Sequence, residues 1–159
     1  MIKTLLKEVK EYKKDTLLSP VYVSIEAILE VLIPFLMAIL VDNGIEKGDM
    51  KSIWFYGFLM LVAAFVSLWA GAKSGKHAAI ASSGFAKNLR KAEYRKIQEF
   101  SFSNVDAYST SGLITRMMTD VTNIQNAYQM MIRVCVRAPL MLIASLVMAF
   151  IINKEMAMI

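Results

Sequence analysis

Three long apolar runs alternate with polar segments along this chain. They cover residues 17–41, 53–72 and 134–152. A helix rises about 1.5 Å per residue and the hydrocarbon core of a bilayer is about 30 Å thick, so each run is long enough to cross a membrane. The pattern therefore predicts three membrane-spanning helices.

The second and third runs are continuous with polar segments that keep a helical pattern. Residues 73–100 follow the second run without a proline or a turn cluster, and residues 113–133 lead directly into the third run. Helices over these segments reach roughly 30–40 Å beyond the bilayer, on either side of a short polar break at 101–112. A simple membrane anchor has no need of that reach. The pattern indicates a hairpin that carries force or information between a membrane and a partner in the water phase.

Two further patterns predict how the polar helices pack. Residues 71–84 are mostly Gly, Ala and Ser. Small side chains let helix backbones approach closely, so this zone is expected to pack against another helix. After the break, one narrow apolar stripe at helical spacing predicts packing along a partner. The stripe consists of positions 114, 117, 121, 124, 128, 131 and 135.

The start and end of the first span carry their own signals. Residues 1–16 place apolar side chains at helical spacing with lysines on the other face, which predicts an amphipathic helix lying in the membrane interface. The pair Ser19-Pro20 is typical of a cap followed by a first helical turn. Gly44 is expected to cap the carboxyl end of the same helix.

Composition and charge support a membrane location. The chain is 57% hydrophobic with a mean hydropathy of +0.48, whereas soluble domains hold about 45–50% apolar residues. Residues 1–16 hold five Lys, and residues 73–116 hold eight Lys and Arg against three acids. Residues 42–52 hold two Lys against three acids. The positive-inside rule then predicts a multi-pass protein of the cytoplasmic membrane with its N-terminus in the cytoplasm, and it explains the basic charge without nucleic acid as a partner.

Three charged residues lie within the apolar runs and are the candidates for a substrate pathway. Glu26 and Glu30 share one face of the first span. Intramembrane acids usually face a cavity or a partner, so the pair could contact cationic substrates or bond to neighbouring helices for structure alone. Arg137 lies just inside the third span and could reach the head groups or line a vestibule open to the cytoplasm.

Nothing in the chain predicts catalytic, metal or nucleotide chemistry. The stretch 71–77 looks like a phosphate-binding loop, but its glycines are separated by three residues instead of four and no strand precedes it. The lone His77 is assigned no chemistry. Cys135 is the single cysteine, which excludes an intrachain disulfide and favours a small core residue. We therefore expect no enzymatic activity and no bound cofactor in this chain.

The polar break carries a likeness to a known family. Residues 102–121 read FSNVDAYSTSGLITRMMTDV, with an aromatic residue, a Ser-Gly turn, a hydrophobic pair and then Thr-Arg-x-x-x-Asp-Val. This resembles the first intracellular loop of ATP-binding-cassette (ABC) exporters. Residues 42–45, 88–90 and 136–139 match further family positions. The likeness covers the whole chain and is closest to bacterial multidrug-type half-transporters.

The resemblance implies an all-α membrane fold: an interfacial elbow helix at 1–16 and a partial transmembrane domain at 17–159. The three long helices would be half of a six-helix domain, with the first intracellular loop at about 73–133. Within that loop, Arg116 and Asp120 would brace the helices beside a coupling helix. The coupling helix would comprise Ser103, Asn104, Val105, Asp106, Ala107, Tyr108 and Ser109.

The resemblance also implies partners outside the chain. A nucleotide-binding domain that binds ATP and Mg²⁺ would rest on the coupling helix, so that the parent protein would be an ATP-hydrolysing translocase. Three further membrane helices and a second half-transporter, identical or different, would complete it. Because these parts are missing from the sequence, we expect the chain to be a fragment.

Two other function classes remain open at this stage. One is an ion-coupled secondary transporter in which Glu26 and Glu30 serve as proton sites. The other is a membrane receptor whose helical stalk signals to a cytosolic kinase.

Overall fold

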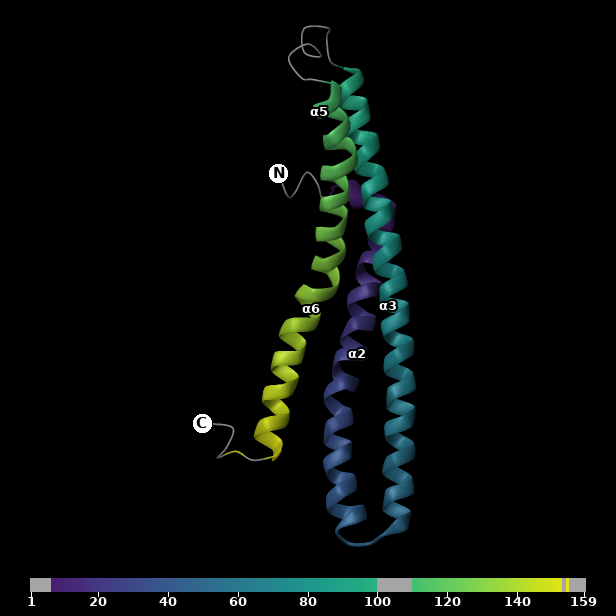
Figure 1. The fold of residues 1–159 in the computed structure, drawn as a ribbon, viewed down its shortest axis with the longest axis vertical. Coiled ribbons are helices and arrows are strands. Elements are labelled where there is room, and N and C mark those ends of the chain that lie inside the picture. The colour runs from purple at the N-terminus through teal and green to yellow at the C-terminus, as the bar shows by residue number, and fades with distance from the viewer. Residues whose placement is uncertain (1–6, 100–109, 153, 155–159) are drawn as a thin grey trace.

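The computed structural model describes residues 7–99, 110–152 and 154, and it forms an elongated helical bundle (Figure 1). Every regular element in these residues is a helix. The predicted coupling helix at 103–109 lies outside the described residues. In chain order the elements are η1 (Lys7–Tyr12), α2 (Lys13–Leu40), η2 (Val41–Ile45), α3 (Met50–Gln98), α5 (Thr110–Thr115), η3 (Arg116–Asp120) and α6 (Val121–Ile152).

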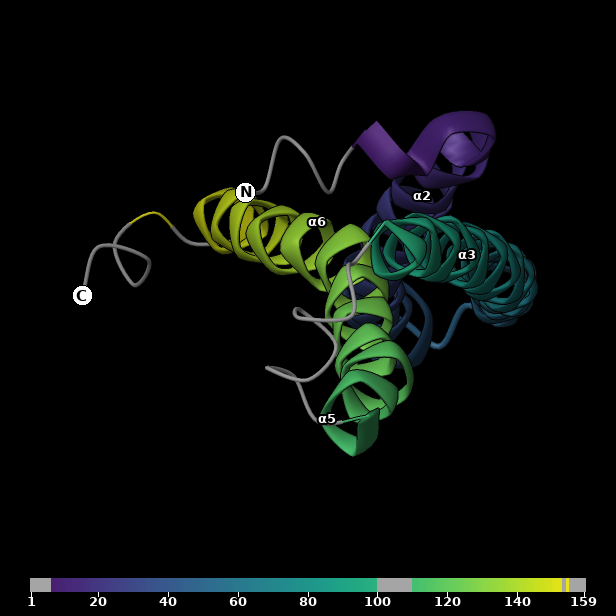
Figure 2. The same cartoon turned by 90° about the horizontal axis from the view of Figure 1, so that it is seen from above.

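Three helical stretches are long and apolar enough to cross a membrane, as the hydropathy pattern predicts. They are Glu8–Ile45, Met50–Gln98 and Arg116–Ile152. Figure 1 shows α2 and α3 side by side as an antiparallel hairpin, and α6 running in the same direction as α2. The upper part of α6 lies against α3, while its C-terminal half diverges from the hairpin, which the view from above also shows (Figure 2). We call the end that carries η1 and α5 the polar end.

The first long helix begins before the apolar run that the sequence shows. Residues 13–16 belong to α2, and Pro20 lies in the helix interior. Only residues 7–12 form a separate segment, in which Lys10 leaves the helical path with φ of 38°. Ser19 does not cap the helix because its side chain bonds to α3 instead.

The turn between α2 and α3 also corrects a prediction. Gly44 does not cap α2, since the helix continues through it as the π-helical turn η2. The left-handed residue is Gly48, with φ of 65°. A Cβ atom on Gly44 would lie 2.7 Å from Cγ1 of Ile53, so this glycine lets α3 approach the end of α2. Asp49 then caps α3, accepting a hydrogen bond from the backbone N–H of Lys51.

The packed core lies at the polar end, where η1, α3 and α6 meet. The predicted apolar stripe is confirmed at Val121 and Tyr128, but Ile132 is buried where position 131 was expected. A straight helix drifts from a 3.5-residue repeat, so the buried positions step from 128 to 132. Cys135 is exposed, which contradicts its interpretation as a core residue. The core consists of Val9, Ala78, Ala81, Phe85, Ala86, Leu89, Val121, Tyr128 and Ile132.

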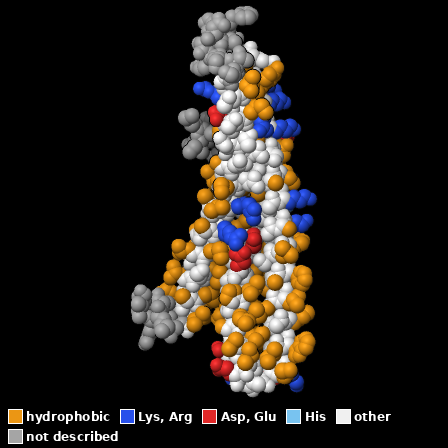
Figure 3. Space-filling view, in the orientation of Figure 1, with side chains coloured by type: hydrophobic (Ala, Val, Ile, Leu, Met, Phe, Trp, Pro, Cys, Tyr) orange, Lys and Arg blue, Asp and Glu red, His pale blue; other side chains and the backbone are white. Residues whose placement is uncertain are grey.

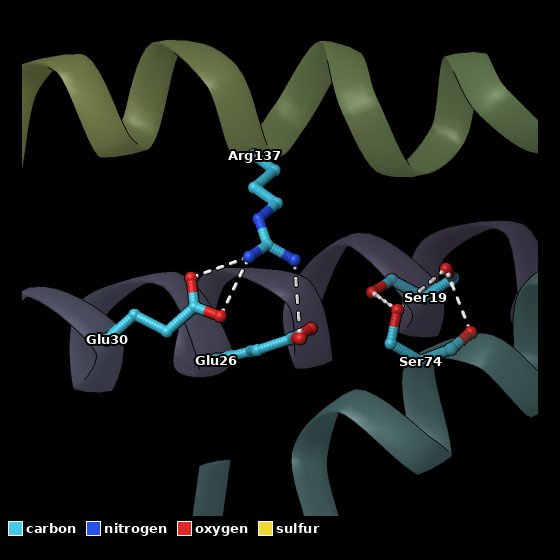
Figure 4. Close-up of polar contacts among 5 residues, drawn as sticks. All are labelled: Ser19, Glu26, Glu30, Ser74 and Arg137. Carbon is cyan, nitrogen blue, oxygen red and sulfur yellow. Dashed lines mark hydrogen bonds and ion pairs between the residues drawn. The ribbon is translucent and has the colours of Figure 1, made fainter. Parts of the chain in front are cut away.

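Small side chains of α3 face α2, which confirms the close packing predicted for residues 71–84. Ser19 and Ser74 are fully buried and bond reciprocally, each hydroxyl donating to the other residue's backbone carbonyl at 3.2 Å and 3.3 Å (Figure 4). The two hydroxyl oxygens are 3.3 Å apart. This reciprocal serine contact fixes the register of α2 against α3.

Substituting leucine for Ser74 is expected to separate α2 from α3. Both serines are fully buried, and overpacking a buried site costs about 1–3 kcal/mol of folding free energy. Ser74→Ala keeps the packing and loses only interhelical hydrogen bonds, at about 0.6 kcal/mol. The thermal midpoint of the purified protein in detergent measures both effects. Ala79→Leu, at an exposed site of α3, is the control, and equal midpoints for it and Ser74→Leu would contradict the packing argument.

Candidate functional site

Three charged side chains meet in the apolar part of the bundle. The guanidinium group of Arg137 reaches from α6 to two carboxylates of α2 (Figure 4). Its Nη2 donates to both oxygens of Glu30, at 2.7 Å and 2.6 Å, and its Nη1 donates to Oε1 of Glu26 at 3.3 Å. The space-filling view shows acidic and basic side chains gathered in the middle of one face, with hydrophobic side chains around them (Figure 3). We call these three residues the Arg137 triad.

The helix geometry explains why the triad forms. Glu26 and Glu30 are four residues apart in α2, so both carboxylates project from one face. Arg137 lies on the neighbouring helix α6, and its planar fork of donors matches two acceptors at once. Ionised groups within an apolar region are stable only when they are paired, so each side of the contact stabilises the other.

Glu26 lies where all three long helices meet. Only 14% of its side chain is exposed, compared with 32% for Glu30 and 36% for Arg137. A Cβ atom on Gly71 of α3 would lie 2.9 Å from Oε1 of Glu26, so the missing side chain makes room for the carboxylate. Oε2 of Glu26 and Nε of Arg133 are buried and have no hydrogen-bond partner in the described part of the chain.

The sequence identified the three residues of the triad but did not join them. It placed Glu26 and Glu30 on one face and treated Arg137 separately, either reaching the head groups or lining a vestibule. The guanidinium instead turns toward α2, so the head-group alternative is not what the structure shows. The missing information was that α2 and α6 are neighbours that run in the same direction, which places an intramembrane cation opposite two acids.

A second cluster joins α2 and α3 nearer the polar end. Nδ1 of His77 lies 2.7 Å from Oδ1 of Asp15, and the His77 ring stacks on Tyr22 with centroids 5.6 Å apart. Tyr22 meets the edge of Trp69 at 5.7 Å, and Lys73 lies over the Trp69 ring at 5.8 Å. The sequence assigned no chemistry to His77 because its partner is 62 residues away. Aromatic and cationic side chains together are typical of a membrane boundary, so we expect the cluster to lie at that level.

The predicted brace residues lie at the two ends of one helical turn. Arg116 and Asp120 begin and end η3, a π-helical turn before α6. Glu93 lies opposite, in the polar part of α3 well beyond the apolar run. Its burial, and secondly the negative charge of Asp120, raise the pKa of Glu93. Asp120 is therefore close to α3, while the role of both residues as a brace remains a prediction.

Comparisons with known proteins agree with this architecture. A family model described as the ABC transporter transmembrane region matches residues 17–159. An uncharacterised ABC transporter ATP-binding protein of Bacillus subtilis (strain 168), YfiB, is 36% identical over 131 residues, covering 82% of this chain and 23% of that protein. An ATP-dependent lipid A-core flippase of Albidiferax ferrireducens is 26% identical over 140 residues, covering 88% of this chain and 24% of that protein.

The chain spans about a quarter of the length of the curated relatives that it matches. It is an all-α, multi-pass membrane protein, and the family model covers most of its residues. On this basis, the chain belongs to the family of ABC transporter transmembrane regions.

Proposed function

We propose that this chain is the membrane-spanning part of an ATP-driven exporter, with its N-terminus and polar end in the cytoplasm. The observation that carries the proposal is the length of α3, which runs unbroken from Met50 to Gln98. Its 49 residues correspond to about 74 Å, more than twice the thickness of the hydrocarbon core. Such a helix can connect a substrate pathway in the membrane to a soluble motor domain. The family match supports an ATP-driven domain as that motor.

In this proposal the motor is a nucleotide-binding domain on another part of the protein. That domain binds ATP and Mg²⁺ and hydrolyses ATP, so the parent protein is the enzyme. Residues 103–109 carry its motion to α3 and α6, with Arg116 and Asp120 bracing the two helices. A second half-transporter and further membrane helices complete the pathway.

We further propose that the substrate pathway passes the Arg137 triad and that the substrate is amphipathic. The triad is partly exposed, and it lies between α2 and α6, whose C-terminal halves diverge. The name of one relative, a lipid A-core flippase, supports an amphipathic substrate. A proton carrier is less well supported, because Arg137 already engages both carboxylates.

A disulfide cross-link tests the coupling proposal. In the full-length transporter, with Cys135→Ala to remove the exposed native thiol, Val105→Cys is paired with a cysteine on the nucleotide-binding domain. We expect a cross-link that varies with ATP, because the coupling helix rests on that domain. Lys47→Cys, in the turn at the opposite end of the bundle, should give none. Absence of the Val105 cross-link in every nucleotide state would contradict the proposal.

A further inference from the structure

A second arginine of α6 lies beside the Arg137 triad without belonging to it. Arg133 lines a cavity of about 470 Å³ together with Glu26 and Glu30 of α2 and several residues of α3, among them Gly71. Arg133 has no ion pair within the described residues, and its buried Nε has no hydrogen-bond partner there. A cation without a partner therefore faces a space that it shares with two carboxylates.

One carboxylate of the triad is also incompletely paired. Both oxygens of Glu30 accept hydrogen bonds from Arg137, at 2.7 Å and 2.6 Å, whereas Glu26 accepts one through Oε1 at 3.3 Å (Figure 4). Oε2 of Glu26 is buried and has no partner in the described part of the chain. Buried polar atoms without partners are costly. The cavity therefore contains a donor on Arg133 and an acceptor on Glu26 that would each stabilise the other.

The charges have the same spacing on the two helices. Glu26 and Glu30 lie about one turn apart on α2, and Arg133 and Arg137 lie about one turn apart on α6. The two helices run in the same direction (Figure 1). Arg133 therefore precedes Arg137 on α6 as Glu26 precedes Glu30 on α2. Since Arg137 reaches Glu30 across the gap between the helices, Arg133 can reach Glu26 one turn earlier.

We propose that Arg133 is an alternative partner of Glu26, so that the contact between α2 and α6 has two charge arrangements. In the shared arrangement, which the structure shows, Arg137 binds both carboxylates. In the ladder arrangement, Arg133 binds Glu26 while Arg137 binds Glu30. The exchange breaks only the longest contact of the triad, at 3.3 Å, and gives each of the four charges one partner.

This exchange provides a way for α6 to move against α2 at low cost. An ion pair that only broke would leave a buried charge uncompensated, which strongly opposes movement. A carboxylate that changes partners stays compensated in both arrangements. The physiological role of the exchange rests on the proposed exporter function, in which packed helices move relative to one another.

A double-mutant cycle tests the exchange on the full-length transporter, purified in detergent without nucleotide. Arg133→Met alone is expected to change the thermal midpoint little, because the shared arrangement does not use Arg133. In an Arg137→Met background Glu26 depends on Arg133. The same change should then lower the midpoint by about 2 °C or more beyond its effect alone. Adding Glu26→Gln to that background should abolish the extra loss.

Two further variants separate charge from packing in this cycle. Arg133→Lys in the Arg137→Met background retains the cation, so it should keep most of the midpoint that Arg133→Met loses. Arg90→Met is the matched control, since Arg90 is a half-buried arginine that bonds Thr122 outside the cavity. Its effect should be the same with and without Arg137→Met.

A charge exchange tests the ladder while Arg137 is present. Glu26→Arg combined with Arg133→Glu recreates the second ion pair with its signs reversed, so the double variant should be more stable than either single variant. Glu30→Arg combined with Arg133→Glu has the same net charge, but it brings a second arginine beside Arg137. This mismatched combination should not recover stability.

Three results would each overturn the inference. The first is an equal effect of Arg133→Met in the unmodified and the Arg137→Met proteins. The second is an extra loss that persists after Glu26→Gln, because Arg133 would then act on another group. The third is equal stability of the matched and mismatched charge exchanges.

A milder background keeps the cycle decisive where Arg137→Met does not fold. In Arg137→Lys a single ammonium group replaces the planar fork and does not hold both carboxylates in the same way, so Glu26 should again depend on Arg133. None of these measurements needs ATP or a nucleotide-binding domain. The cycle can therefore succeed where the Val105 cross-link fails, and the reverse, which separates failure of the exchange from failure of the exporter proposal.

Discussion

Replacing Arg137 with methionine is expected to destabilise the bundle by about 3 kcal/mol. Removal of one partner from a buried ion pair costs about 3–5 kcal/mol, because the other charge is left without compensation. Here two carboxylates lose their cation, but their side chains are 14% and 32% exposed, so the lower part of that range applies. The measurement is the thermal midpoint of the purified protein in detergent. It is read from the loss of the monodisperse size-exclusion peak on heating.

A charge-free triad separates loss of pairing from loss of packing. Methionine keeps much of the volume of the arginine stem, so Arg137→Met combined with Glu26→Gln and Glu30→Gln removes the charges with little change in shape. We expect most of the lost stability to return, because no ion is left unpaired in the apolar region. Arg90→Met, at a half-buried site outside the triad, is the control and should change stability by less than about 1 kcal/mol. If the triple variant were no more stable than Arg137→Met alone, the ion pairs would not be the cause.

Adding one methyl group at Gly84 is expected to displace the N-terminal segment from α3. A Cβ atom on Gly84 would overlap the aromatic ring of Tyr12, which packs directly on this glycine. Overpacking of this kind costs about 1–3 kcal/mol. We expect Gly84→Ala to expose η1, so that trypsin cleaves after Lys10 and Lys13 faster than in the unmodified protein.

A second glycine of α3 provides the matched control, because its substitution is expected to raise stability instead of lowering it. Gly75 has no heavy atom within 4 Å of the position that a Cβ atom would take. Because alanine is favoured over glycine in a helix by about 1 kcal/mol, Gly75→Ala should leave cleavage unchanged and raise the thermal midpoint. Tyr12→Ala should restore stability to Gly84→Ala by removing the overlapping ring. Similar behaviour of the two glycine variants would argue against the proposed contact.

The helices themselves follow from the sequence because they depend on local properties. Hydropathy and helical spacing locate three spans and their polar extensions, and small residues mark the face of α3 that packs on α2. Errors arise where a long-range contact overrides a local signal. Ser19 has the features of a helix cap, yet its hydroxyl bonds to Ser74 in α3. Gly44 has the features of a cap as well, but the close approach of Ile53 requires the glycine.

The candidate site shows the same division between local and distant information. The sequence places Glu26 and Glu30 on one helix face, since only helix geometry is needed. It does not place Arg137 against them, because those contacts join residues 111 and 107 positions apart. The contact between Asp15 and His77 was missed for the same reason. A single sequence indicates which side chains share a face of each helix. Which helices are neighbours, and in what axial register they lie, depends on packing.

The reciprocal serine contact has a mechanical consequence for α3. Ser74 lies at the centre of this helix, 24 positions from Met50 and 24 positions from Gln98. Each arm is therefore about 36 Å long. If α3 turns as a rigid rod about this contact with α2, the two tips move equally in opposite directions. A rotation of about 8° then shifts each tip by about 5 Å, so α3 would act as an equal-armed lever that reverses the direction of movement without amplifying it.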